Sequence, residues 1–277
     1  MTPATDAIPP VLHSDRYYPP VPLGPAINTA GAEDSPFITG DGNELYFFFT
    51  PDANIPPEKQ LLDGVTGVYV SRKAQDQWGP AERVVLQDEG ELSMDGAVFV
   101  RGDEMWFASA RQGNYRGVDA WIAERINGNW TNWRNAGEKL NVEYEIGEFH
   151  ISPDGNELYF HSGGAGGKGG YDIWVSRKLN GEWQMPENVE AVNTTETEGW
   201  PFITADGREL WFLRTYYGTP GIFVSRKAGG QWGQPELVIS QFAGEPSLDA
   251  GGNIYFVHHF VRDGKIIEAD IYVAMLK

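Results

Sequence analysis

The stretch Glu148–Phe160 reads Glu-Phe-His-Ile-Ser-Pro-Asp-Gly-Asn-Glu-Leu-Tyr-Phe, and it decides the fold. Two short apolar runs flank Asp154-Gly155. An Asp-Gly pair between such runs predicts a tight antiparallel hairpin, because glycine tolerates the positive φ that the turn needs. The stretch begins with a carboxylate and ends in an aromatic pair. Versions of it recur along the chain, so the fold follows from a repeat.

Aromatic pairs mark the copies of this repeat, at intervals of about 44 to 60 residues. The pairs are Tyr46-Phe47, Trp106-Phe107, Tyr159-Phe160, Trp211-Phe212 and Tyr255-Phe256. A variable loop and a second apolar strand follow each pair, and in four copies a turn and a tryptophan then introduce a further short strand. Four short strands in about 40–50 residues are typical of one propeller blade. We therefore expect an all-β chain, a five-bladed β-propeller with four antiparallel strands per blade.

The fifth copy has no strand marked by a tryptophan, and a counterpart of that strand occurs near the N-terminus. The segment 18–29 aligns with 183–194, and both place Asn-Thr at the same offset. We expect this N-terminal strand to complete the last blade and close the ring, which removes sheet edges that favour aggregation. The predicted organisation is an N-terminal extension over 1–17 and a single propeller domain over 18–277.

Composition and charge exclude several classes of partner. The formal net charge is −18, so phosphate groups would be repelled and a nucleic-acid partner is not expected. The chain has no cysteine, which excludes disulfides, thiolate metal sites and a cysteine nucleophile. No apolar run is long enough for a membrane span. The compartment stays open between the cytoplasm and, with a signal segment removed, the periplasm or the exterior.

Two segments of the third copy carry a resemblance to a known repeat. Ser152-Pro153-Asp154-Gly155 and Asp172-Ile173-Trp174-Val175, with a later Gly-x-Trp, resemble the WD40-like PD40 repeat of TolB-type β-propellers. The resemblance extends over about residues 18 to 277. It implies a propeller fold, and it implies little about function, since such propellers serve both as binding scaffolds and as enzymes.

Each copy also carries a carboxylate near the start of its first strand. Aligning the copies predicts one acidic ring around a central funnel, made of Asp34, Asp95, Glu148, Glu198 and Glu245. Converging carboxylates repel one another, so either some stay protonated or a cation binds among them. Oxygen ligands suit a divalent cation, for which we expect Ca²⁺, with Mg²⁺ or another metal as alternatives. The alternative is a water-filled channel in which these acids hydrogen-bond to neighbouring backbone.

A second set of polar and aromatic residues differs from copy to copy, as a binding site requires. The residues predicted to act in catalysis are Glu148, His150, Asp95, Glu198 and His258. Those predicted to contact a substrate are Trp200, Arg214, Arg111, Tyr115 and Tyr216. Histidine and carboxylates can move protons, and arginine with aromatic rings can hold a hydroxylated or anionic ligand.

Three functions follow from this pattern. The first is a metal-assisted hydrolase of an ester, phosphoester or glycoside, with its site in the carboxylate-lined funnel. The second is a non-catalytic, TolB-like propeller that binds a glycan, a peptide or a partner protein. The third is a structural domain whose channel holds only water and an ion. For the first, we expect a monomer with a small molecule or glycan as its ligand.

Overall fold

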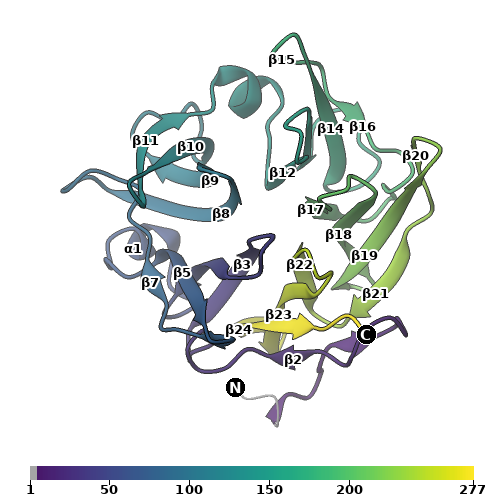
Figure 1. Ribbon diagram of the computed structural model, residues 1–277, viewed down its shortest axis with the longest axis horizontal. Coiled ribbons are helices and arrows are strands. Elements are labelled where there is room, and N and C mark those ends of the chain that lie inside the picture. The colour runs from purple at the N-terminus through teal and green to yellow at the C-terminus, as the bar shows by residue number, and fades with distance from the viewer. Residues whose placement is uncertain (1–4) are drawn as a thin grey trace.

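The computed structural model describes residues 5–277, and the chain is all-β there, as the repeats predict. Figure 1 shows successive sheets standing side by side around a central axis, with β2 lying against β24. The two named helices are short and lie in connections between strands: α1 spans Pro57–Gln60 and the π-helix η2 spans Lys139–Glu143. No helix in the described range is long and apolar enough to cross a membrane.

The strands follow the sequence repeats in order. The first three repeats contribute β3 (Ala32–Ile38), β4 (Glu44–Thr50), β5 (Gly67–Ala74), β6 (Gln77–Trp78) and β7 (Glu82–Arg83); β8 (Ser93–Arg101), β9 (Glu104–Arg111), β10 (Asp119–Ile126) and β11 (Asn129–Asn135); and β12 (Phe149–Ile151), β13 (Glu157–Ser162), β14 (Asp172–Leu179), β15 (Glu182–Trp183) and β16 (Glu187–Asn188). The last two contribute β17 (Glu198–Ile203), β18 (Glu209–Tyr216), β19 (Thr219–Ala228), β20 (Gln231–Trp232) and β21 (Glu236–Ser240); and β22 (Ala243–Leu248), β23 (Ile254–Arg262) and β24 (Lys265–Ala274). Pairing within each repeat is antiparallel.

The N-terminal segment joins two of these sheets. Strand β1 (Val11–Leu12) pairs with β21, and β2 (Val21–Pro22) pairs with β24. Between them Tyr17 is only 2% exposed, and its ring meets Trp211 edge-on at 6.3 Å. The described part of the predicted extension is therefore packed against the sheets.

A β-bulge recurs near the start of the first strand in four repeats. The pairing register shifts there in β3, β8, β17 and β22, and one residue in each bulge has positive φ: Ser35, Ala97, Trp200 and Glu245. A bulge adds a residue to one strand and turns the backbone locally. Side chains before the bulge and within it therefore point in different directions. The position of an acidic residue relative to the bulge thus determines where its carboxyl group lies.

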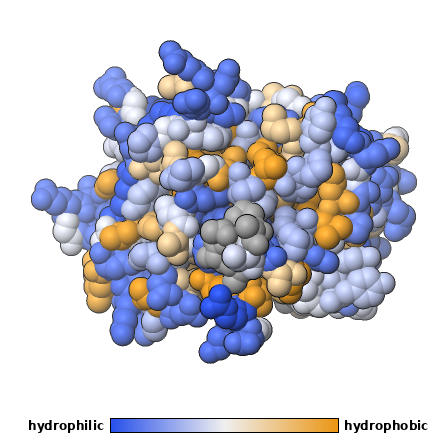
Figure 2. Space-filling view, turned by 90° about the horizontal axis from the view of Figure 1, so that it is seen from below, coloured by the Kyte–Doolittle hydropathy of each residue, from blue (hydrophilic) through white to orange (hydrophobic). Residues whose placement is uncertain are grey.

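The outer surface is mixed in character. Figure 2 shows one side of the molecule, where hydrophobic residues are scattered among hydrophilic ones. The interior holds aromatic residues of the repeats. Four of them are fully buried: Tyr46, Phe107, Tyr159 and Trp211. The aromatic pairs read from the sequence thus belong to the core.

Candidate functional site

The central channel is lined by the same three positions of every repeat. They are Ser35-Pro36-Phe37, Ala97-Val98-Phe99, Glu148-Phe149-His150, Trp200-Pro201-Phe202 and Glu245-Pro246-Ser247. They enclose a cavity of about 50 Å³. That volume has room for an ion or a few waters, since one water needs about 10–15 Å³ of such space.

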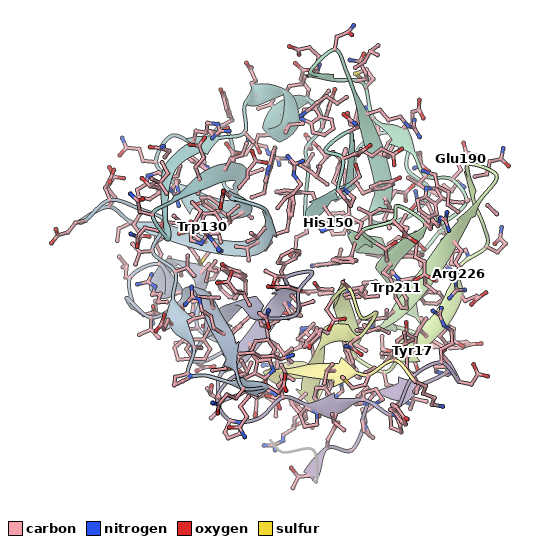
Figure 3. The ribbon with its side chains drawn as sticks, viewed as in Figure 1. Tyr17, Trp130, His150, Glu190, Trp211 and Arg226 are labelled. Carbon is pink, nitrogen blue, oxygen red and sulfur yellow. The ribbon has the colours of Figure 1, made fainter. Side chains whose placement is uncertain are left out.

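An aromatic belt narrows the channel. His150 lies 4.5 Å from the ring of Phe202, 5.0 Å from that of Phe99 and further from Phe37. Figure 3 places His150 near the centre of the ring of sheets, whereas Trp130 and Arg226 lie nearer its outside. These four belt residues line the small cavity and also a larger one of about 710 Å³ on the side of the Asp-Gly turns. The belt therefore divides the two cavities.

Three side chains from the first and last repeats form an acidic cluster with one imidazole. Single ligand atoms of Asp34, Glu245 and His259 lie within 4.8 Å of one another, and His259 Nε2 is 3.8 Å from Asp34 Oδ2. Ser35 Oγ donates a 2.9 Å hydrogen bond to Glu245. Among the residues described, this is the group of His, Asp and Glu that could hold a metal ion.

The environment moves the pKa values of the clustered carboxyl groups in opposite directions. Burial opposes the ionisation of Asp34, but His259 and the backbone N–H of Ser35 outweigh burial and lower its pKa. Burial, the charges of Asp34 and Glu148 and a hydrogen bond with Asp34 raise the pKa of Glu245 well above its usual range. Two neighbouring acids with one lowered and one raised pKa share a single proton, as is expected of carboxyl groups that cannot both ionise.

Glu148 belongs to the same electrostatic group. Burial, followed by the charge of Asp34, raises the pKa of Glu148 to about 8, so its carboxyl group carries a proton at neutral pH. Trp200 lies beside it and counteracts part of this rise, yet the indole Nε1 is buried without a partner at hydrogen-bond distance in the described structure. A protonated acid and an indole N–H donor thus lie together at the channel.

The ligand types of the cluster fit a divalent metal. Two carboxylates and an imidazole suit Zn²⁺ or Mn²⁺ better than an all-oxygen cage would, because imidazole is a preferred ligand of transition metals. The sequence-based expectation of Ca²⁺ assumed oxygen ligands alone. His259 adds a nitrogen donor to that set.

The five predicted ring acids do not form one ring. Glu148 and Glu245 line the channel cavity, and Asp34 lies close to Glu245 without lining it, whereas Asp95 and Glu198 have partners elsewhere. Asp95 accepts hydrogen bonds from Ser93 and Ser109 and pairs with Arg111 at 2.7 Å. Glu198 is fully buried. It accepts bonds from the backbone and hydroxyl of Thr194 and pairs with Arg214 at 2.8 Å.

The bulge explains this division. Asp95 and Glu198 precede the bulge and pair with Ser109 and Arg214 of the adjacent strand, whereas Glu245 stands within the bulge. The predicted ring therefore merged three positions of the repeat: Glu148 and Glu245 at the bulge position, Asp34 one residue before it, and Asp95 and Glu198 two residues before it. Arg111 and Arg214 are held by these buried acids and by the carbonyls of Leu86 and Val192, not presented to the channel.

The two histidines predicted to act in catalysis have other contacts. His150 accepts a 3.2 Å hydrogen bond from the backbone N–H of Ile203, and burial lowers its pKa to about 3. His258 is fully buried and bonds Asp6 through Nε2 at 2.9 Å. His258 does not line the channel cavity, although its neighbour His259 reaches the acidic cluster.

The predicted aromatic contacts divide similarly. Trp200 lines the channel, as described above. Tyr115 is exposed in the loop before β10, where its backbone N–H bonds Asp119. Tyr216 meets Tyr217 and Phe223 edge-on within its own repeat. Neither tyrosine lines the channel cavity.

Two histidines that matter to the site were missed in the sequence. His259 was overlooked because the alignment of the repeats singled out His258 instead. His161 lies between the rings of Tyr171 and Trp200, at 4.9 and 4.8 Å. Its nitrogens lie 3.4 and 3.3 Å from the backbone nitrogens of Glu148 and Trp200. The available signal was that His161 replaces an apolar residue of the other second strands (Phe48, Ala108, Leu213 and Val257).

Comparisons with known proteins identify the fold. No family model matches the chain, and no curated protein sequence matches it. A protein of unknown function from Dyadobacter fermentans superposes with a TM-score of 0.57 at 12% identity, over 95% of this chain and 99% of its own. TolB from Acinetobacter baumannii gives 0.54 at 14% identity, over 91% of this chain and 56% of its own. An endo-arabinase from Bacteroides thetaiotaomicron gives 0.55 at 16% identity, over 91% and 96%.

These structural neighbours are β-propellers, and the chain has an all-β fold of that kind. They include a hydrolase, the endo-arabinase, and a protein of unknown function. At such low identity the likeness concerns the fold alone. The chemistry has to be argued from the side chains of this site.

Proposed function

We propose that the protein is a metal-assisted hydrolase whose site is the acidic cluster of the channel, with an ester, phosphoester or glycoside as substrate. The observation that carries the proposal is the cluster itself. Asp34, Glu245 and His259 offer converging metal ligands, and Glu148 lies near enough to interact with Asp34 and Glu245 electrostatically. Carboxyl groups whose environments drive their pKa values apart are the usual basis of acid and base roles at one site.

In this proposal each residue has a distinct task. A divalent cation held by Asp34, Glu245 and His259 would polarise a substrate oxygen or lower the pKa of a water. Glu148 holds a proton at neutral pH and is placed to donate it to the leaving oxygen. Trp200 offers its unpaired indole N–H and its ring face to the substrate. His161 is a positioning residue, because it contacts the backbone of both Glu148 and Trp200.

The proposal includes the architecture that builds the site. We infer a single five-bladed domain over 18–277 with PD40-like repeats, acting as a monomer, whose last blade is completed by β2. The pairing of β2 with β24 supports ring closure, and the contribution of three residues per repeat to the channel supports five blades. Closure brings the first repeat, with Asp34, beside the last repeat, with Glu245 and His259.

The test is turnover on a panel of esters, phosphoesters and glycosides, with and without a chelator. Wild-type protein should hydrolyse at least one class, Glu148→Gln should lower that turnover at least about a hundredfold, and metal removal should abolish it. Glu198→Gln, assayed well below its melting temperature because it breaks a buried pair with Arg214, is a matched control, since Glu198 does not line the channel cavity. Turnover that survives both treatments would contradict the mechanism. A complete absence of turnover would favour the binding module for a glycan, peptide or partner protein instead.

A further inference from the structure

A further cavity, of about 610 Å³, lies between the second and third repeats beside the channel. Ala97, Glu148 and Phe149 line both this cavity and the small one of the channel, so the two adjoin. Small-molecule sites occupy about 300–1,000 Å³. The cavity of 610 Å³ is therefore large enough for a ligand, whereas the channel cavity of 50 Å³ is too small for one.

One repeat has a small residue at a packing position beside this cavity. Elsewhere a large residue of one repeat fills the space over a glycine of the next: Phe48 meets Gly96, His161 meets Gly199 and Leu213 meets Gly244. The second repeat has Ala108 at this position, and Ala108 and Gly147 line the cavity. His161 of the third repeat covers Gly147 instead, and the small side chain of Ala108 widens the opening beside it.

An arginine without an acidic partner lines this opening. Arg116 donates through one Nη to the carbonyl of Ile146 at 3.3 Å, while its Nε is buried with no hydrogen-bond partner. Within residues 5–277 no ion pair to Arg116 is present. A buried unpaired donor is costly, and an anionic ligand would relieve that cost.

The other polar groups of the cavity suit a hydroxylated ligand. Asp119 is already satisfied by the N–H groups of Tyr115 and Arg116 and by the side chain of Asn135. Ser162 accepts a hydrogen bond from Gly164, which leaves its hydroxyl proton to donate. Glu145 and Tyr171 stand at more exposed positions of the lining, offering an acceptor and an aromatic face.

We propose that this cavity binds a sugar ring that bears a carboxylate, such as a hexuronic acid unit, with the carboxylate paired to Arg116. Ser162 and Glu145 would contact ring hydroxyls, and Tyr171 would cover an apolar face. The inference deepens the proposed function, on which it rests for the role of the unit as part of the substrate. Binding itself requires neither turnover nor a metal.

The experiment measures binding of glucuronate and galacturonate, with glucose and galactose as neutral matches, by calorimetry on chelator-treated full chain carrying Glu148→Gln. Each acidic sugar should bind at least about tenfold more tightly than the corresponding neutral sugar, because a charged hydrogen bond usually contributes that much affinity. Arg116→Gln should remove that preference. Ala108→Leu, which copies Leu213, should block binding of the acids by filling the cavity.

Arg83→Gln serves as the matched control, because Arg83 also lacks an acidic partner but bonds the carbonyls of Gly64 and Thr66 outside the cavity. Equal binding of acidic and neutral sugars, or acid binding that survives Ala108→Leu, would overturn the inference. Should Arg116→Gln fail to fold, the Ala108→Leu result and the acid-to-neutral ratio decide the matter. Acid binding without any turnover would leave the inference standing and count against the hydrolase alone.

Discussion

The backbone N–H of Ile203 donates a hydrogen bond of 3.2 Å to Nδ1 of His150, which joins the first strands of the third and fourth repeats. Ile38 and Ser247 make the matching contact at 3.0 Å where the fifth repeat meets the first. Because Nδ1 accepts, the ring proton is on Nε2. His150 is thus a neutral acceptor that joins two repeats.

Replacing His150 by phenylalanine, the residue of three other repeats at this position, tests that role. The N–H of Ile203 would lose its acceptor, so we expect the free energy of unfolding to fall by about 1–3 kcal/mol. Turnover at saturating substrate should be nearly unchanged. Urea unfolding and kcat measure the two effects, and a loss of kcat at unchanged stability would restore His150 as a catalytic residue.

Glu148→Gln should lower kcat by about 10²–10⁴, the range for loss of a general acid. The pH profile gives an independent check. The pKa of Glu148 is raised to about 8, so its acid form is present below that pH, and activity should decline as pH rises through it. Rates that instead rise steadily above pH 8 would assign Glu148 to a base or to a structural role.

Metal analysis of protein purified without chelator should give about one equivalent of divalent cation per chain, and His259→Ala should lower its affinity by at least about tenfold. Adding Zn²⁺, Mn²⁺ or Ca²⁺ back to stripped protein identifies the metal, and the imidazole favours the first two. His13→Ala, whose ring contacts Ser240, is the control. Unchanged metal content in His259→Ala would remove that residue from the site.

Asp95→Asn should destabilise the fold and spare the chemistry. The substitution would leave Arg111 charged, 7% exposed in its side chain and without its 2.7 Å partner, at a cost of about 3–5 kcal/mol. Thermal melting and kcat at a temperature well below the melting point separate the two effects. A folded, inactive variant would mean that Asp95 takes part in the reaction.

Asp270 should make stability depend on pH in an unusual direction. Burial, with the charge of Glu33, raises its pKa from 3.8 to about 7, so the folded state holds a proton that the unfolded state releases. This contribution is fully present below pH 4 and is lost as pH rises toward 7, by up to about 1.4 kcal/mol per pH unit. Asp270→Asn should reduce this slope in urea titrations, while the slope due to Glu148 and Glu245, whose pKa values are also raised, remains. An unchanged slope would contradict the assignment.

The sequence predicted the scaffold better than the site, for a physical reason. Aromatic pairs and Asp-Gly turns are local signals, and each was found in the strand or turn expected of it. The positions of the acidic side chains depend on a bulge. Its positive-φ residues are as different as Ser35, Ala97 and Trp200, so no residue type in the sequence predicts it. The register shift places Glu198 against Arg214 and Glu245 at the channel, although both precede an aromatic pair at similar distances. His259 reaches the cluster only because distant repeats adjoin.

Because Val21 pairs with Val273, strand β2 can join its sheet only after nearly the whole chain has been synthesised. A ribosome that adds 5–20 residues per second needs roughly 10 to 50 s between these two valines. Strand β2 has no partner during that interval, and β1 likewise waits for β21. Asp34 and Glu245 therefore meet only when synthesis is nearly complete, which makes the acidic cluster one of the last parts of the molecule to form and exposes the waiting strands to chaperones and proteases.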